Sequence, residues 1–206
     1  MRLDIAERLI CPEPHARTPL VVVALETRGR DVIRAAVGCM QCRREWTIEQ
    51  GTLLLDSAVS APDGATSEPS DALLSRLEAL LGVTDPGTPL LLGGRYVQVA
   101  PALVARCEAV VAVLPAAGAS PEGVGHVQGA PSVVPFADAT FAAALLDGTM
   151  APALVEDAGR VVRVGGRIVG DASLPLPPRV RELARDAEHW VGEVQAAPSV
   201  VPLRRA

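Results

Sequence analysis

Residues 134–170 read VPFADATFAAALLDGTMAPALVEDAGRVVRVGGRIVG, and this stretch decides the fold. Its aliphatic run at 141–146 predicts a buried strand, because strands covered on both faces lack polar alternation. A helix is predicted over 149–162, with Pro152 tolerated in its first turn. A second strand is predicted at RIVG, 167–170. A strand, helix and strand in this order indicate an α/β fold with a parallel sheet.

The same alternation continues on both sides of this stretch. Upstream, Ser70 and Gly82 are suitable start and stop signals for a helix over 71–81. Further strands are predicted at 89–94, 109–114 and 124–129, with a short helix at 101–107. Downstream we expect a helix over 179–188, followed by a terminal hairpin formed by WVGEVQ and SVVPLR.

The composition limits the classes of function. Of 206 residues, 49% are hydrophobic and only 2% are aromatic, so Ala, Val and Leu must form the core. Few aromatic residues argue against a base-stacking platform, and a net charge of −5 gives no attraction to a phosphate backbone. We therefore expect no nucleic-acid partner.

The N-terminus, MRLDIAERLI, carries charges throughout, so it does not read as a signal peptide. No run approaches 18 uncharged apolar residues, and we expect no transmembrane segment. A cytoplasmic protein is the expectation. In that compartment four Cys are metal ligands or inert thiols rather than disulfides.

Changes in composition divide the chain into three parts. Residues 1–56 hold three of the four Cys, and residues 57–70 are small, polar and rich in Pro and Gly, as linkers are. Residues 71–206 carry the alternating strands and helices. We expect a small β module, a linker and a larger α/β domain.

Four residues of the first part have the spacing of a zinc site. Cys39 and Cys42 form a C-x2-C knuckle, and Cys11 and His15 supply a C-x3-H pair upstream. A hairpin formed by VVVALE and VIRAAV would bring the pairs together around one structural Zn²⁺. The alternative is that the module persists through packing without the metal.

This part resembles the small zinc-ribbon module found beside, or fused to, methyltransferases that act on tRNA and release factors. The similarity covers residues 3–55: an initial helix, L-x-C-P, C-x-x-C, then an aromatic residue and G-x-L-x-L. The family usually has C-P-x-C as its first knuckle, whereas here His15 takes the place of the second cysteine.

Residues 89–206 resemble a class I S-adenosylmethionine (SAM) methyltransferase, which implies a Rossmann-like sheet. VPFADATF (134–141) follows the family pattern L-P-F-x-D-x-S-F-D, except that Ala142 stands at its acidic end. EDAGRVVRVGGRIV (156–169) follows E-x-x-R-V-L-R-P-G-G-R-L-V. The resemblance places Gly165 and Gly166 in a sharp turn into the fifth strand.

The cofactor half departs from the family pattern. The glycine loop G-x-G-x-G is reduced to Gly93 and Gly94, followed by Arg95. The second strand ends in Leu114 where the family has a ribose-binding carboxylate, and the third is followed by Gly129 and Ala130. Each unpaired buried hydroxyl of a ribose costs about 1–3 kcal/mol, so we expect SAM to bind weakly or not at all.

The sequence therefore favours a non-catalytic pseudo-methyltransferase, an accessory subunit docked on a larger assembly. That assembly is a soluble complex or the cytoplasmic face of a membrane complex. Arginines of the first module would contact the partner: Arg28, Arg30, Arg34, Arg43 and Arg44.

One alternative is an active SAM-dependent enzyme with a rebuilt pocket, in which Arg95 binds the methionine carboxylate and Asp147 lies at the tip of the fourth strand. A third interpretation is a binder of another small ligand at the same crevice. His126 is expected to be packed or on the surface, and His189 to be exposed.

Overall fold

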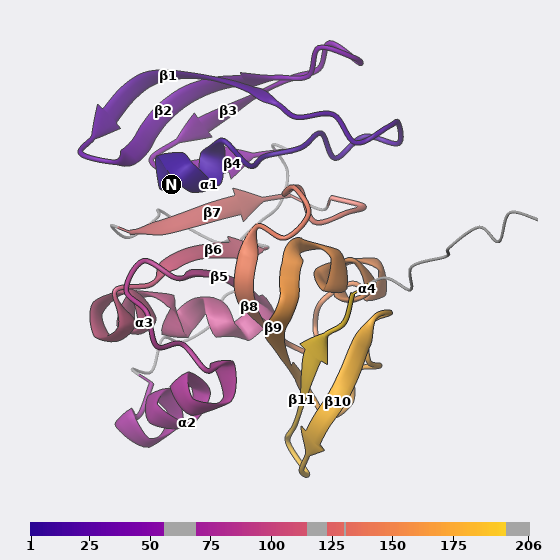
Figure 1. The fold of residues 1–206 in the computed structure, drawn as a ribbon. Helices are drawn as coiled ribbons and strands as arrows, with labels where there is room; N and C mark the ends of the chain where they lie inside the picture. The colour runs from indigo at the N-terminus through magenta and orange to yellow at the C-terminus, as the bar shows by residue number, and fades with distance from the viewer. Residues whose placement is uncertain (56–68, 115–122, 130, 197–206) are drawn as a thin grey trace, which may run out of the picture.

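The computed structural model describes residues 1–55, 69–114, 123–129 and 131–196. All eleven strands of these residues join one sheet in the order β1-β2-β3-β4-β7-β6-β5-β8-β9-β11-β10. Figure 1 shows the first four strands stacked above the other seven, with helices against both parts.

The first part is an antiparallel ribbon preceded by one helical turn. Its elements are α1 (Leu3–Ala6), β1 (Val21–Arg28), β2 (Asp31–Gly38), β3 (Glu45–Glu49) and β4 (Thr52–Leu54). The predicted hairpin is confirmed, because β1 pairs with β2 from Val21 opposite Gly38 to Arg28 opposite Asp31. Alternate residues of β3 are buried, as are Ala35 and Val37 of β2, as expected for strands with one face on a core.

The second part alternates strands and helices. Its elements are α2 (Asp71–Leu81), β5 (Pro89–Gly93), the 3₁₀ helix η1 (Gly94–Val99), α3 (Ala100–Cys107), β6 (Val110–Leu114), β7 (Val124–Gln128), β8 (Phe141–Leu146), α4 (Pro152–Val161), β9 (Val162–Asp171), β10 (Val180–Arg185) and β11 (His189–Val194). The predicted cap of α2 is present, since the Ser70 side chain accepts a hydrogen bond from the Leu73 N–H. Among the described helices, none has both the length and the apolar character that crossing a membrane requires.

Seven strands of the second part form a doubly wound sheet. Counted in chain order they lie 3-2-1-4-5-7-6, and the pairings from β7 to β9 are all parallel. Only β11 runs against its neighbours. The order 3-2-1-4-5 is that of a Rossmann-like sheet, which confirms the expected fold class. The order reverses between β5 and β8, the place where such sheets bind ligands.

The ribbon and the doubly wound sheet are continuous. β4 pairs in parallel with β7, with Thr52 opposite His126 and Leu54 opposite Gln128. The hydrophobic core continues across the same junction: Leu9, Ile48, Leu53, Val127 and Phe136 are all fully or almost fully buried in one cluster. The two parts are therefore stabilised by shared burial as well as by backbone hydrogen bonds.

Alternate residues of the central strands supply two cores. Leu91 of β5 faces the core that contains α1 and α4, whereas Leu90 and Leu92 face the core beneath α2 and α3. This explains why the central strands are aliphatic throughout, since both of their faces are covered. The few aromatic residues lie mostly in the first core, where the rings of Phe136 and Phe141 pack edge to face at 5.0 Å.

The helix predicted over 179–188 is wrong. Residues 180–185 form the edge strand β10, which pairs with β11 from Val180 opposite Val194 to Arg185 opposite Trp190. Its charged residues fit a strand whose outer edge meets water, and pairing overrides their preference for a helix. The proposed second hairpin strand, SVVPLR, lies outside the described residues.

Two boundaries differ from the prediction. α4 begins only at Pro152 and is shorter than expected, and β9 is longer, beginning at Val162. Gly165, at φ +78°, therefore lies within β9, where the register with β8 shifts. A Cβ atom on Gly166 would overlap the carbonyl oxygen of Ala142, so the second glycine lets the two strands approach.

Arg160 joins the two methyltransferase-like motifs. Its guanidinium, 8% exposed, donates to the backbone carbonyls of Val134 and Phe136 at 2.8 and 2.6 Å. It also pairs with Asp157 at 2.6 Å and with Asp138 at 2.9 Å. Asp157 in turn accepts from the Val134 N–H. The loop 134–140 and helix α4 are thus held by one network centred on the buried Arg160 side chain.

We predict that Arg160→Met destabilises the protein by about 3 kcal/mol, because it leaves the part-buried Asp157 carboxylate, 13% exposed, without its cation. Arg163→Met is the matched control, since Arg163 is exposed and has no ion pair among the described residues; it should change stability by less than about 0.5 kcal/mol. Urea unfolding of both variants measures the difference. Equal effects would contradict a structural role for the network.

His126 is buried where the ribbon joins the larger sheet. From the sequence we expected it to be either packed or on the surface, and the structure shows it packed. It is 3% exposed, and its Nδ1 atom has no hydrogen-bond partner in the described part of the chain. Burial lowers its pKa to about 4, and the positive charge of the Met1 amino group adds to this. The imidazole is therefore neutral in the folded protein at neutral pH.

The shift predicts a loss of stability in acid. Between pH 6.5 and about 4 the unfolded chain binds a proton at His126 that the folded chain does not, so stability falls as the pH is lowered. The full shift corresponds to about 3 kcal/mol. His126→Leu should remove this component, measured as the difference between the urea unfolding free energies of wild type and variant at pH 7 and pH 4.5. An unchanged difference would show that the residue does not titrate as described.

Candidate functional site

The predicted metal ligands come together at one end of the ribbon. Cys11 and His15 lie in the loop before β1, and Cys39 and Cys42 in the tight turn after β2. Their four ligand atoms all lie within 4.8 Å of one another. The turn is closed by the Cys39 N–H and the Arg44 carbonyl, 3.0 Å apart.

The distances match a tetrahedral site. Cys11 Sγ lies 3.7 Å from Cys42 Sγ, and His15 Nε2 lies 3.1 Å from Cys11 Sγ and 3.6 Å from Cys39 Sγ. Zn–S bonds of about 2.3 Å in a tetrahedron place two sulfurs roughly 3.8 Å apart. The residues present therefore fit a zinc ion.

The environment of the ligands also suits a cation. His15 Nδ1 lies 2.7 Å from the Ala16 carbonyl, so a proton on Nδ1 leaves Nε2 free as a ligand. Burial raises the pKa of Cys11 to about 12, whereas a hydrogen bond from the backbone of Arg44 lowers the pKa of Cys42. A buried thiol of this kind becomes a thiolate when a metal supplies positive charge.

The second candidate site is the crevice at the carboxyl end of β5, where the sheet order reverses. The reduced glycine loop lies here, with Gly94 at φ +61°. A Cβ atom on Gly93 would overlap the side chain of Met150, and one on Gly94 would lie 2.5 Å from Asp147 Oδ1. Met150 and Asp147 are 5% and 1% exposed. Side chains of this protein therefore fill the space above both glycines.

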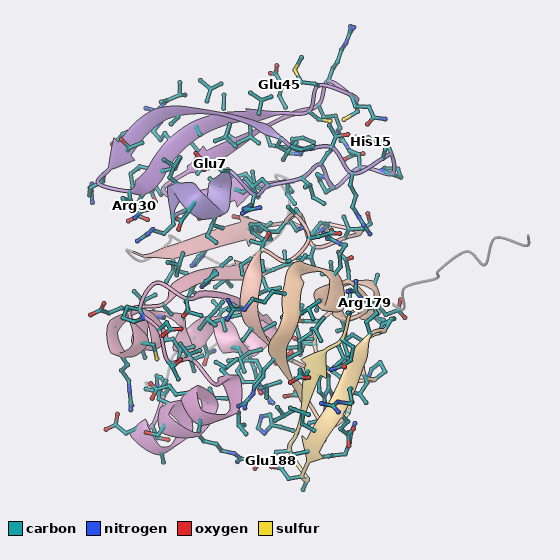
Figure 2. The ribbon with its side chains drawn as sticks, viewed as in Figure 1. Glu7, His15, Arg30, Glu45, Arg179 and Glu188 are labelled. Carbon is teal, nitrogen blue, oxygen red and sulfur yellow. The ribbon has the colours of Figure 1, made fainter. Side chains whose placement is uncertain are left out.

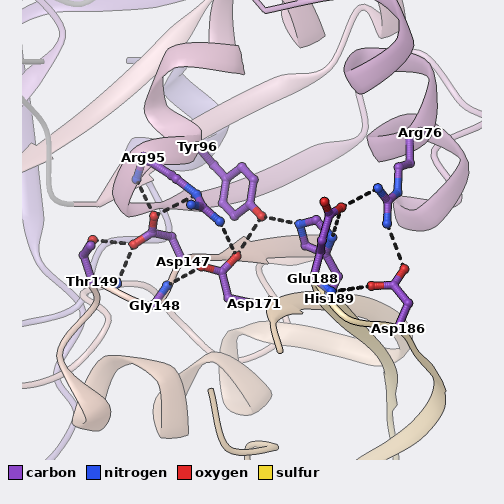
Figure 3. Close-up of polar contacts among 10 residues, drawn as sticks. All are labelled: Arg76, Arg95, Tyr96, Asp147, Gly148, Thr149, Asp171, Asp186, Glu188 and His189. Carbon is purple, nitrogen blue, oxygen red and sulfur yellow. Dashed lines mark hydrogen bonds and ion pairs between the residues drawn. The ribbon is translucent and has the colours of Figure 1, made fainter. Parts of the chain in front are cut away.

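The hydrogen-bond donors at this strand tip are also occupied. The Arg95 N–H donates to Asp147 Oδ2 at 3.2 Å, and the Thr149 N–H and hydroxyl donate to Asp147 Oδ1. The Gly148 N–H donates to Asp171 Oδ2 at 2.9 Å. Figure 3 shows both carboxylates held between these donors and the Arg95 side chain.

Arg95 bridges the two carboxylates. Its guanidinium lies 3.3 Å from Asp147 and 2.8 Å from Asp171. The rebuilt site considered from the sequence needs Arg95 to grip a ligand carboxylate at the tip where Asp147 lies. In the structure these two residues form an ion pair with each other, so the Arg95 guanidinium already has carboxylate partners within the protein.

The ribose-binding position holds no acidic group among the described residues. β6 ends in Leu114, which is fully buried in the hydrophobic core. Gly129 follows β7 and is buried; Ala130, like residues 115–122 after β6, lies outside the described residues. The family's second-strand carboxylate is thus replaced by a packed aliphatic side chain.

A pocket of about 550 Å³ lies beside the filled tip, and the sequence did not reveal it. Tyr96 donates to Asp171 at 3.0 Å and lies 2.8 Å from His189 Nε2 (Figure 3). Burial raises the pKa of Tyr96 to about 12. The expectation that His189 is exposed is wrong, since it is 8% exposed. The only available signal was Asp171, directly after the predicted fifth strand.

Comparisons with known proteins find similarity only to solved structures. No protein-family model matches the sequence, and no curated protein is significantly similar to it. Similar solved structures are methyltransferases. Geranyl diphosphate C-methyltransferase from Streptomyces coelicolor A3(2) is 20% identical, with a TM-score of 0.40 over 56% of this chain and 51% of that one.

Two other structures extend the comparison. The antibiotic-resistance methyltransferase Kmr is 14% identical, with a TM-score of 0.41 over 68% of this chain and 99% of that one. A complex of the Haloferax volcanii Trm112 methyltransferase activator with a methyltransferase gives 13% identity and a TM-score of 0.37, covering 48% and 56%. The chain spans about half the length of the geranyl diphosphate enzymes. At such TM-scores, the fold assignment rests on the strand order.

Proposed function

We propose that this protein is a non-catalytic methyltransferase-like protein that acts as an accessory subunit of a larger protein assembly. The observation that carries the proposal is the set of hydrogen bonds at the tip of the strands. There the N–H groups of Arg95, Gly148 and Thr149 donate to the protein's own carboxylates, Asp147 and Asp171. In a SAM-binding tip, such N–H groups are left for the methionine carboxylate.

Binding SAM at this tip would require a costly rearrangement. Its carboxylate would have to displace Asp147, which is 1% exposed and would become a buried charge without its donors. Removing the partner of a buried charge costs about 3–5 kcal/mol. Met150 would also have to leave the space above Gly93. Leu114 offers the ribose nothing in return.

A fold kept without this chemistry needs another role, and the ribbon offers a surface for one. Four of its large hydrophobic side chains are exposed: Val21 by 47%, Val23 by 53%, Leu25 by 62% and Met40 by 77%. Clustered exposed apolar residues are typical of protein–protein contacts. The four thiols are free, in keeping with the cytoplasmic location that we propose.

The proposal predicts no saturable binding of SAM, or of its demethylated product, in the low micromolar range in calorimetric titration. Met150→Ala should not restore binding, because it adds space but leaves Asp147 on the N–H groups. Protein isolated from its native source should carry a companion at fixed stoichiometry, and the fraction in which it sediments shows whether that companion is soluble or membrane-bound.

A low-micromolar isotherm for SAM would favour the alternative, an active methyltransferase with a rebuilt pocket. Elution of the native protein as a free monomer, with no reproducible companion, would remove the accessory role. The SAM titration and the isolation of the native protein are independent experiments. The absence of catalysis and the accessory role can therefore be refuted separately.

We also propose that Cys11, His15, Cys39 and Cys42 hold one structural zinc ion. All four positions are taken by protein side chains, and closed sites of this kind stabilise a fold rather than catalyse. The ion would fix the loop before β1 to the turn after β2. The three parts 1–56, 57–70 and 71–206 remain a prediction, since residues 56–68 lie outside the described residues.

Elemental analysis of protein purified without chelator should give close to one zinc per chain. Cys42→Ser should lose most of the metal, because three ligands bind zinc far more weakly than four. Cys107→Ser is the matched control, since Cys107 lies at the end of α3 outside the cluster, and it should keep the metal. Chelation should lower the thermal midpoint of the wild type. A metal-free protein with an unchanged midpoint would refute the site.

A further inference from the structure

The ribbon leaves one strand edge open. β1 ends the eleven-stranded sheet, whereas the other edge of the ribbon, β4, is already paired with β7. The opposite end of the sheet is β10, whose exposed residues include Arg181, Glu182 and Arg185. Charged side chains of this kind protect an edge strand from pairing with other chains. The two edges of one sheet are therefore treated differently.

β1 carries no charge over its first five residues, and its pairing with β2 is regular from Val21 to Ala24 and shifts in register after Ala24. Residues 21–25 read VVVAL, without charge, proline or glycine. The side chains of Val21, Val23 and Leu25 are about half exposed or more, and Val22 packs against the core. Within the described part of the chain, the N–H and C=O groups of β1 that point away from β2 make no hydrogen bond with other backbone groups. This edge has both the apolar character and the free backbone groups of a pairing site.

A groove of about 1230 Å³ adjoins this edge on the outer face of the ribbon. Val21 and Val23 form one wall, and Ala36, Thr47 and Leu54 continue the surface across β2, β3 and β4. Side chains of a strand added beside β1 would alternate between this face and the opposite one. Alternate aliphatic residues of such a strand would therefore extend the aliphatic part of this groove, whose lining also includes Arg43, Arg44 and Glu45.

Unpaired arginines lie near both ends of the apolar run. Arg28 ends β1 and Arg30 follows in the turn, whereas Arg43 lies near Val21 at the metal-cluster end. None of the three side chains has an ion pair within the described residues, in contrast to Arg34 and Arg44. Figure 2 labels Arg30 at one end of the ribbon and His15, of the metal cluster, at the other.

We propose that β1 accepts an extended segment of the partner protein as an additional strand. The inference rests on the proposed accessory function and names its mode of docking. The segment has about seven residues, with aliphatic side chains at alternate positions and an acidic residue at each end. Main-chain hydrogen bonds would supply affinity, and the alternate side chains and end charges specificity.

Charge argues against a second copy of this chain as the occupant. Antiparallel pairing of two β1 strands would bring Arg28 of each copy toward Arg43 of the other. Like charges placed together oppose association, whereas acidic ends on a partner segment meet arginines that make no ion pair with the described part of the chain. The free arginines therefore select a partner of opposite charge.

The experiment uses the full chain and a capped peptide, Glu-Val-Thr-Val-Thr-Val-Glu, at low salt. We expect saturable binding in fluorescence anisotropy, weakened at least tenfold when Lys replaces both Glu. Two further peptides carry N-methyl groups on alternate backbone nitrogens, one on the odd and one on the even positions. Only one of these two sets of N–H groups faces β1, so methylation of that set alone should abolish binding. Hydrogen exchange should show new protection of alternate amides in β1 on binding.

Val23→Lys should weaken peptide binding at least tenfold. Leu183→Lys is the matched control, because Leu183 is 45% exposed on the other edge strand, and it should bind as the wild type does. Equal binding of the two methylated peptides, or no binding of the Glu peptide, overturns strand addition. A reversible dimer that Val23→Lys dissociates would identify a second copy as the occupant and also overturn it. If the Val23→Lys variant, isolated from the native source, still carries the companion, the accessory function stands and only docking by strand addition is ruled out.

Discussion

Three residues of β4, Thr52–Leu54, make one sheet out of what would otherwise be two, because they pair in parallel with β7. The rest of the structure depends on this junction. The hydrophobic core follows it, so that Leu53 and Val127 are buried in the same cluster as α1 and α4. Backbone pairing fixes the register between the parts, and the shared apolar burial stabilises it. The ribbon is consequently a fixed extension of the larger sheet.

This junction has a consequence for the exposed surface. A ribbon of four strands has two edges, and one of them is consumed inside the molecule. The apolar edge strand β1 is left at the far end, with its aliphatic side chains in water and arginines near both ends. At the other end of the sheet, β10 carries charges along its exposed side. The protein thus protects one edge from association and leaves the other available.

At the strand tip, side chains of the protein itself take up the hydrogen-bond donors of the loops. Parallel strands direct their carboxyl ends, and the N–H groups of the loops that follow, to one place, which suits an anion. Here that place holds Asp147 and Asp171, with Arg95 between them. The carboxylates satisfy the donors and the arginine balances their charge. The network stabilises the tip through interactions within the protein itself.

The segments with strong local patterns were predictable from sequence. Aliphatic runs without alternation indicated the buried strands β5, β6 and β8, and Ser70 with Gly82 fixed the ends of α2. The spacing of Cys11, His15, Cys39 and Cys42 indicated a common site, because a hairpin with a knuckle at each end has few other geometries. These features depend on contacts between residues that are near in sequence or held by one hairpin.

The remaining features were decided by tertiary structure. The segment 179–188 has the composition of a helix, and only pairing with β11 makes residues 180–185 a strand. The closing of the strand tip could not be read from the sequence, because Met150 and Asp147 reach glycines more than 50 residues away. His189 is buried against Tyr96 for the same reason. Sequence by itself determined which elements form and where a metal fits, since those depend on short-range periodicity and spacing. Tertiary structure alone decided which polar groups satisfy one another, because hydrogen bonds between distant segments leave no local pattern.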